Sequence, residues 1–230
     1  MTLPQILDRL QDHYGRPKPP HPSDPFEMVV HRNAGYPQSD VRCNKGFLSL
    51  QEKIGVTPAQ ILTAPDAALA AALKGSVMKP ELGARRLKEC AMLVEAVFAG
   101  DLRKALKLPV AQARKVFKKF PTIGDSGADK ILLFTKTAPV AAVPSNSVQV
   151  LTRLGFAKES PSYAARYKSA QQALLDAFPD DIPAQLRAYL LIKTHGESLC
   201  KNTNPRCMEC PVRTSCAYFS KTTGKSRAKT

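Results

Sequence analysis

Four cysteines towards the carboxyl end of the chain are the residues best suited to chemistry. They follow the pattern C-x6-C-x2-C-x5-C as Cys200, Cys207, Cys210 and Cys216. Four thiolates within seventeen residues can converge on one centre without help from distant chain, and all-sulfur ligation suits zinc or an iron-sulfur cluster. Zinc ribbons tend to pair two C-x2-C knuckles, whereas here one pair is flanked by single cysteines. The spacing therefore favours a [4Fe-4S] cluster, with zinc and unliganded thiols as the alternatives.

The charge of the chain indicates a polyanionic partner. There are 34 basic and 19 acidic side chains, giving a formal charge of +15 on 230 residues. An excess of positive charge of this size favours nucleic acid as the partner. The alternative is that the charge only keeps the protein soluble. No stretch approaches the roughly 20 apolar residues of a membrane span, and residues 1–10 lack the order of a signal peptide. We therefore expect no membrane association and a cytoplasmic, nucleoid-associated protein.

Apolar residues recur at helical spacing almost everywhere, so we expect an all-α fold. Thr57 before Pro58 offers an N-cap oxygen, and Pro183 suits the first turn of a later helix. In a compartment that keeps thiols reduced, the isolated Cys43 and Cys90 are predicted to be small core residues.

Three segments break this helical pattern. Residues 16–25 hold five prolines and are predicted to link a short first helix to one that begins near Phe26. Residues 138–144 are apolar and read as a buried extended connection. Residues 217–230 hold four basic residues and no acid, and are predicted to be a disordered basic tail.

The motif His195-Gly196-Glu197, followed by the cysteine pattern, resembles the C-terminal cluster loop of the helix-hairpin-helix glycosylase superfamily, in the branch of endonuclease III. The resemblance implies a structural or electronic [4Fe-4S] cluster. It also implies that basic residues of the loop contact the DNA backbone, with Lys201, Arg206 and Arg213 as candidates.

The same family implies a helix-hairpin-helix upstream, and residues 120–128 are similar to its L-P-G-h-G turn. Such a turn opens a helix and points free backbone amides at one phosphate, so Thr122, Ile123, Gly124 and Ser126 are candidate DNA-binding residues. Seven basic residues precede the turn against the single acid Asp101, and they would hold the DNA backbone without reading sequence: Arg103, Lys104, Lys107, Arg114, Lys115, Lys118 and Lys119. One departure is Thr122, which stands where the family has its first turn glycine.

Two family positions for catalysis are occupied by residues that cannot do that chemistry. Ser126 stands at the lysine of the bifunctional members, which argues against efficient AP lyase activity. Pro144 stands at the catalytic aspartate, and Ser145 or Asn146, reached by shifting the alignment, supply no negative charge. Lys130, one turn after Ser126, is a weak substitute for the lysine.

Another acid would have to replace the aspartate if catalysis survives. Asp125 and Asp129 flank the hairpin, while Asp40 and Glu27 lie in the N-terminal part of the expected barrel. Asp125 is more simply interpreted as the N-cap of the helix that starts near Ser126.

The segment from Pro25 to Val41 matches the opening helix of the family's barrel. Relatives carry an intercalating glutamine where this chain has Pro37, so the neighbours Tyr36 and Gln38 are candidates for contact with the bases. A polar trio of His31, Arg32 and Asn33 replaces apolar residues, with Asn33 at the position of a catalytic glutamate in adenine glycosylase. The trio suggests altered pocket chemistry from His31 and Asn33, or else a solvent-facing side of the helix.

The resemblance covers residues 1–216 and implies two helical lobes. Residues 25–137 would form a helical barrel domain ending in the helix-hairpin-helix. Residues 1–24 and 138–216 would form the iron-sulfur cluster domain. A monomer is expected to bind damaged or kinked double-stranded DNA in the cleft between the lobes, with one base flipped out.

Two functional hypotheses follow. The first is a divergent DNA glycosylase of base excision repair that excises a damaged or modified base whose glycosidic bond is already labile. The second is a non-catalytic binder of lesions, abasic sites or bent DNA. A zinc protein that binds RNA is a third reading, which fails if the purified protein is brown and contains about four irons.

Overall fold

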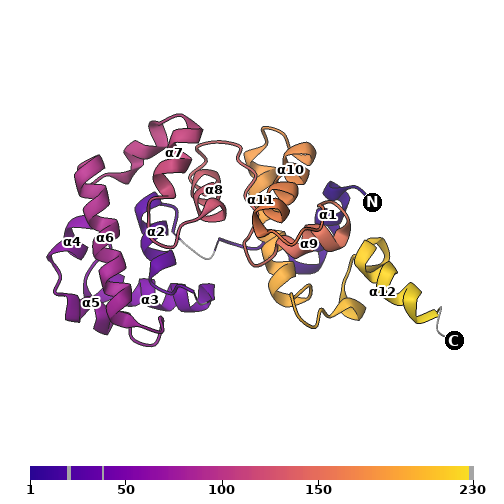
Figure 1. Cartoon of the computed structure of the whole chain (residues 1–230), viewed down its shortest axis with the longest axis horizontal. Helices are drawn as coiled ribbons and strands as arrows, with labels where there is room; N and C mark the ends of the chain where they lie inside the picture. Colours follow the sequence, from indigo (N-terminus) through magenta and orange to yellow (C-terminus); the bar gives the residue numbers. More distant parts are fainter. Residues whose placement is uncertain (20–21, 38, 228–230) are drawn as a thin grey trace. The chain divides into compact units, whose positions relative to one another are not determined.

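The computed structural model describes residues 1–19, 22–37 and 39–227, and in these ranges the chain is helical without a β-strand. The all-α prediction is therefore confirmed. None of the helices described is long and apolar enough to cross a membrane. The elements, drawn in Figure 1, are α1 (Leu3–Tyr14), α2 (Pro25–Asn33), α3 (Asp40–Lys53), α4 (Pro58–Thr63), α5 (Asp66–Ala72), α6 (Pro80–Phe98), η1 (Leu102–Lys107), α7 (Val110–Phe117), α8 (Asp125–Phe134), α9 (Val148–Leu154), α10 (Tyr163–Ala177), α11 (Ile182–Ser198), η2 (Cys207–Glu209), η3 (Arg213–Ser215) and α12 (Ala217–Arg227).

The chain divides into two compact units. Unit 1 combines Met1–Lys18 with Ala138–Thr230, and unit 2 is the continuous segment Pro19–Thr137. Unit 1 therefore joins the first helix of the sequence to the C-terminal segment that begins at Ala138.

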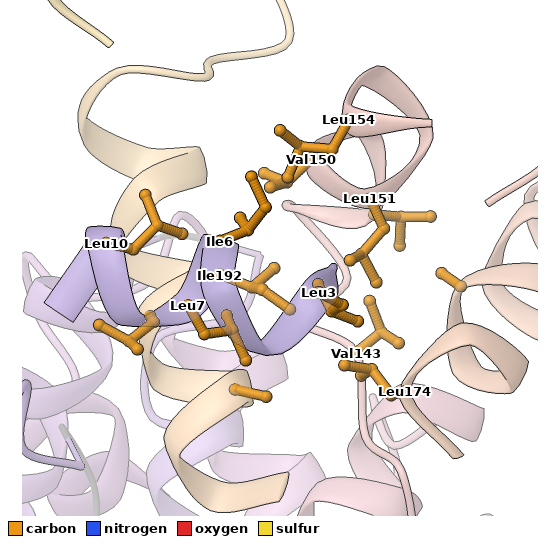
Figure 2. Close-up of a cluster of buried hydrophobic side chains, with 14 of the residues drawn as sticks. Leu3, Ile6, Leu7, Leu10, Val143, Val150, Leu151, Leu154, Leu174 and Ile192 are labelled. Atoms are coloured by element: carbon orange, nitrogen blue, oxygen red, sulfur yellow. The ribbon is translucent and has the colours of Figure 1, made fainter. Parts of the chain in front are cut away.

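Helix α1 packs against the rest of unit 1 through one apolar face. Leu3, Ile6, Leu7 and Leu10 recur at helical spacing and are at most 4 % exposed. They join a cluster with residues of α9, α10 and α11, in which Leu151, Leu174 and Ile192 are also buried (Figure 2). Since full burial of such a side chain contributes about 1.5–3 kcal/mol, this face holds α1 on the unit.

Local sequence signals set several helix starts, of which those at Thr57 and Pro183 confirm the predictions. Thr2 and Thr57 both form capping boxes, with Gln5 and Gln60 respectively, before α1 and α4. A proline lies in the first turn of α11, as expected from Pro183. Such caps satisfy backbone donors that a helix start leaves unpaired.

Helix α6 is the longest helix described in unit 2 and packs against α2, α4 and α5. Its buried stripe includes Leu87, Cys90, Ala91 and Val94. Cys43 of α3 is also fully buried, so the prediction that Cys43 and Cys90 are core residues is confirmed.

The connection at residues 138–144 is non-helical, and Ala141, Ala142 and Val143 in it are buried, as predicted. The prediction for the C-terminal tail was wrong for residues 217–227, which form α12. Tyr218 and Phe219 pack against the apolar cluster of unit 1, because two adjacent aromatic side chains gain by leaving water. Residues 228–230 lie outside the described part of the chain.

Candidate functional site

The hairpin of unit 2 consists of α7, a turn and α8. Apolar residues from each part are buried against the unit: Ala113, Phe117, Phe120, Ile123, Ala128, Ile131 and Leu132. The turn itself is closed by a hydrogen bond from the Ile123 amide to the Phe120 carbonyl at 3.2 Å. Among the candidate DNA-binding residues, Ile123 is thus a packing residue. Its side chain is buried and its amide already donates within the turn, so it is not a free donor for a phosphate.

The N-terminus of α8 is open to an incoming ligand. Gly124 is its N-cap and is exposed, and nothing lies within 4 Å of the place where a Cβ would be. The amides of the first turn of a helix have no acceptor within the helix, and the helix dipole adds positive potential there. This geometry suits a phosphate oxygen at Gly124 and Ser126.

Asp125 does not cap this helix, contrary to the prediction. It is the first residue of α8, and no side-chain cap is formed. Instead its carboxylate lies 2.6 Å from Lys118 Nζ and 3.2 Å from Arg114 Nη2. The hydrogen bond from Lys118, helped by the Arg114 charge, lowers the pKa of Asp125. Arg114 of α7 and Lys118, which follows the helix, neutralise the carboxylate, and so it is ionised at neutral pH.

Asp129 forms the buried end of the same ion-pair network. It is fully buried, and Arg114 donates from Nε and Nη2 to its two carboxylate oxygens at 2.6 and 3.1 Å. A bidentate pair of this kind fixes α7 against α8. Among the acids weighed as substitutes for the catalytic aspartate, Asp125 and Asp129 are therefore both occupied by cations.

Asn33 connects α2 to the turn of the hairpin. Its side chain is 1 % exposed, and Nδ2 donates to the carbonyls of Val29 and Pro121 at 3.0 and 3.1 Å. The Thr122 hydroxyl donates to its Oδ1 at 3.2 Å. Thr122 has a φ of +66°, in the left-handed region. Sequence patterns gave no signal for this link, since it joins residues 89 positions apart.

His31 is also buried, at 2 % exposed, and its ring lies 5.8 Å from that of Phe47. The alternative that the polar trio forms a solvent-facing side of α2 is therefore wrong for His31 and Asn33. Only Arg32, which is half-buried, extends towards solvent.

Tyr36 is half-buried and lies beside two guanidinium groups. The Cζ atoms of Arg32 and Arg86 lie 4.7 and 5.5 Å from its ring centroid. Any base stacking on Tyr36 must compete with these cations for the ring. Gln38 lies outside the described residues.

The two family positions for catalysis lie in different units. Ser126 is in the first turn of α8 in unit 2, and Lys130 follows one turn later on the same helix. Pro144 belongs to unit 1 and is buried, whereas Ser145 and Asn146 are exposed. Neither Ser126 nor Pro144 carries an ionisable group.

All four cysteines of the C-terminal motif line one pocket in unit 1, between the end of α11 and the start of α12. Burial raises the pKa of the Cys200 thiol, and burial raises that of Cys210 to about 11. The nearby thiols add to both shifts. An all-sulfur donor set facing one pocket fits a four-thiolate centre, and a bound cation would displace the protons. Among the described residues, no group of three or more histidine, cysteine, aspartate or glutamate side chains is arranged so that it could hold a metal ion.

Arg153 of α9 orders the start of this loop. Its guanidinium donates to the carbonyls of Lys201 and Asn202 at 2.6 and 2.9 Å, and Nη1 lies 3.5 Å from the Cys200 sulfur. His195 lines the same pocket, with Nε2 3.7 Å from the Cys210 sulfur. The histidine was noted in the sequence only as part of a motif, and the role of Arg153 was missed.

The basic candidates for the DNA backbone differ in how free their charges are. Lys119 and Lys201 are exposed. Lys118 is paired with Asp125, and Arg206 forms an exposed ion pair with Glu209 at 2.8 Å. Exposed ion pairs contribute at most about 1 kcal/mol, so either cation can leave its carboxylate and bind a phosphate.

Comparison with known proteins finds relatives in sequence and in fold. No family model matches the chain. Endonuclease III of Sulfolobus acidocaldarius is 28 % identical over 179 residues, covering 75 % of this chain and 73 % of the relative. Endonuclease III of Escherichia coli is 24 % identical over 223 residues, covering 94 % and 95 %.

Solved structures agree in fold. A non-covalent endonuclease III–DNA complex superposes with a TM-score of 0.76 at 21 % identity, covering 97 % of this chain and 99 % of the other. A thermostable thymine-DNA glycosylase gives 0.74 at 20 % identity, covering 95 % and 94 %. The chain is therefore similar in sequence to endonuclease III over most of its length, and it shares the all-helical fold of these DNA glycosylases.

Proposed function

We propose that this protein binds damaged or kinked duplex DNA as a monomer and acts as a divergent, monofunctional DNA glycosylase. The observation that carries the proposal is the hairpin, in which the exposed N-terminus of α8 at Gly124 follows a basic helix. Lys118 and Lys119 on one side and Lys201 and Arg206 on the cluster loop supply charge for phosphates, which fixes position without reading sequence.

The chemistry open to such a site is hydrolysis without a covalent enzyme intermediate. Water adds to C1′ of the sugar, the N-glycosidic bond breaks, and the departing base takes the electron pair and a proton. Ser126 has no amine for a Schiff base, so the abasic product is not cleaved. Because Pro144 supplies no carboxylate, the substrate must be a base whose glycosidic bond is already labile.

A second candidate is a non-catalytic binder of lesions, abasic sites or bent DNA. The burial of Pro144 at the position of the catalytic aspartate favours it. So does the engagement of Asn33 in structural hydrogen bonds, since this residue was a candidate for altered pocket chemistry.

A panel of duplexes with single lesions, assayed for base release and for strand cleavage, separates the two candidates. Release of one class of base without strand cleavage supports the glycosylase. No product anywhere, with tighter binding to a damaged than to an intact duplex, supports the binder. Equal affinity for damaged and intact duplexes contradicts the binder.

We further propose that the thiolates of Cys200, Cys207, Cys210 and Cys216 hold a [4Fe-4S] cluster. When bound, the cluster supplies structure and electronic properties to the loop, while base release takes place elsewhere. The protein purified without oxygen should be brown and contain about four irons per chain. Cys210→Ser should lose the colour, whereas Cys90→Ala, which changes a cysteine of the unit 2 core, should keep it. A colourless protein with one zinc would refute the assignment.

A further inference from the structure

We propose that Asn33 positions the DNA-binding turn between α7 and α8. It does this by holding Thr122 in the left-handed backbone conformation. The effect on DNA affinity rests on the proposed function. The coupling between the two residues is a property of unit 2 alone.

The first step concerns Thr122. Its φ of +66° is a conformation that glycine adopts freely and that a β-branched residue resists. A strained residue of this kind persists only where its surroundings determine it. Thr122 therefore needs a partner that compensates for the strain.

The second step is that Asn33 is built to be this partner. One amide side chain contacts two successive residues of the turn, since Nδ2 donates to the Pro121 carbonyl and Oδ1 accepts from the Thr122 hydroxyl. Its remaining donor is used by the Val29 carbonyl one turn earlier in α2. The side chain is therefore anchored in α2 and holds the turn at its far end. Asn33 itself is 1 % exposed, although its two partners in the turn are half-buried. Hydrogen bonds of a buried side chain are stronger than those at the surface.

The third step links these hydrogen bonds to the binding of DNA. Thr122 lies two residues before Gly124, the N-cap of α8, and only the buried Ile123 stands between them. The backbone angles of Thr122 therefore set the direction in which the following amides point. Relaxation of Thr122 to a negative φ would turn these amides away from a phosphate.

The experiment compares Asn33→Ala, Thr122→Gly and the double variant. Affinity is measured for a short duplex containing a tetrahydrofuran abasic analogue, and amide hydrogen exchange is measured across residues 122–126. Asn44→Ala serves as the matched control, because Asn44 is an exposed asparagine on α3 of the same unit.

Asn33→Ala should speed exchange in the turn and weaken binding about tenfold, the effect expected of losing the compensation for one strained residue. Glycine at 122 needs no such compensation, so the affinity of the double variant should lie within about threefold of that of Thr122→Gly alone. The control Asn44→Ala should bind as wild type does. The extent of exchange distinguishes positioning of the turn from a general loss of stability: the first speeds exchange at residues 122–126 alone, whereas the second speeds it throughout unit 2.

Unchanged exchange in Asn33→Ala would overturn the proposal. So would a loss of affinity that Thr122→Gly leaves in place. If Asn33→Ala does not fold, Thr122→Val removes the hydroxyl at constant shape and should by itself speed exchange in the turn. Failure of the wild-type protein to bind the duplex would refute the proposed function instead, and the exchange data would still decide the coupling.

Discussion

The hydroxyl of Tyr14 lies 2.9 Å from Nδ1 of His195, so the last residue of α1 is tied to α11 by a hydrogen bond across 181 positions of sequence. Ser198 donates to the same hydroxyl at 3.0 Å. His195 is 1 % exposed, and its other ring nitrogen faces the Cys210 sulfur. The tyrosine therefore fixes both the end of α1 and the orientation of a ring that lines the cysteine pocket.

Tyr14→Phe should destabilise unit 1 by about 1–2 kcal/mol, because it leaves a ring nitrogen of buried His195 without this partner. Denaturant unfolding followed by circular dichroism measures the loss. Tyr163→Phe, at an exposed tyrosine of α10, should change the free energy of unfolding by less than about 0.5 kcal/mol. Equal stability of Tyr14→Phe and the wild type would show that the hydrogen bond contributes nothing.

Asp129→Ala should be more damaging. The substitution removes the fully buried carboxylate that Arg114 contacts at 2.6 Å. Because Arg114 is 33 % exposed and keeps Asp125 at 3.2 Å, the loss should be about 2–3 kcal/mol, less than for a fully buried pair. Asp66→Ala is the control, since Asp66 is largely exposed and its pair with Lys88 spans 3.9 Å. Chemical unfolding should separate the two variants, and a loss below about 1 kcal/mol for Asp129→Ala would contradict this interpretation of the pair.

Asp125→Asn should change the pH dependence of stability. Lys118 lowers the pKa of Asp125 in the folded state, so the ionised carboxylate favours folding. This contribution is fully present above the ordinary pKa of about 3.9 and is lost as pH falls through the lower folded-state value. The variant should therefore be less stable at neutral pH, by under about 1 kcal/mol for a partly exposed pair, and should equal the wild type in strong acid. Thermal unfolding between about pH 7 and pH 2 tests this, and a constant difference at all pH values would rule it out.

Pro144→Asp should not by itself produce a fully active glycosylase. Pro144 is buried, and a carboxylate placed there loses hydration, which raises its pKa and disfavours the charged form that the chemistry needs. Ser145→Asp, at the exposed neighbour, controls for added charge. Base release from the lesion panel is the measurement. Robust excision by Pro144→Asp would show that one substitution restores the site.

The sequence predicted what depends on local signals. Thr57 and Pro183 mark helix starts because a cap acts within one turn, and the apolar stripe around Leu87 needs only helical periodicity. The cysteine motif could be placed in one pocket because its members are close in sequence.

Contacts between distant residues were beyond such patterns. Nothing local to Asn33 indicates that it meets Thr122, and the stripe of α1 does not say that α11 covers it. Asp125 was predicted to be a cap because aspartate is common at that position. Its carboxylate instead forms ion pairs with Arg114 and Lys118. In α12, Tyr218 and Phe219 outweighed a basic composition that indicated disorder.

The pairing of α1 with α11 has a consequence for synthesis on the ribosome. The tyrosine at the end of α1 leaves the tunnel 181 residues before its histidine partner, an interval of roughly 10–35 s at about 5–20 residues per second. Throughout that time the four apolar side chains of α1 face water, while the continuous segment of unit 2 emerges with all its own partners. Nascent chains stalled before α11 should therefore carry a folded unit 2 and an uncovered amphipathic helix, the part that a chaperone would bind.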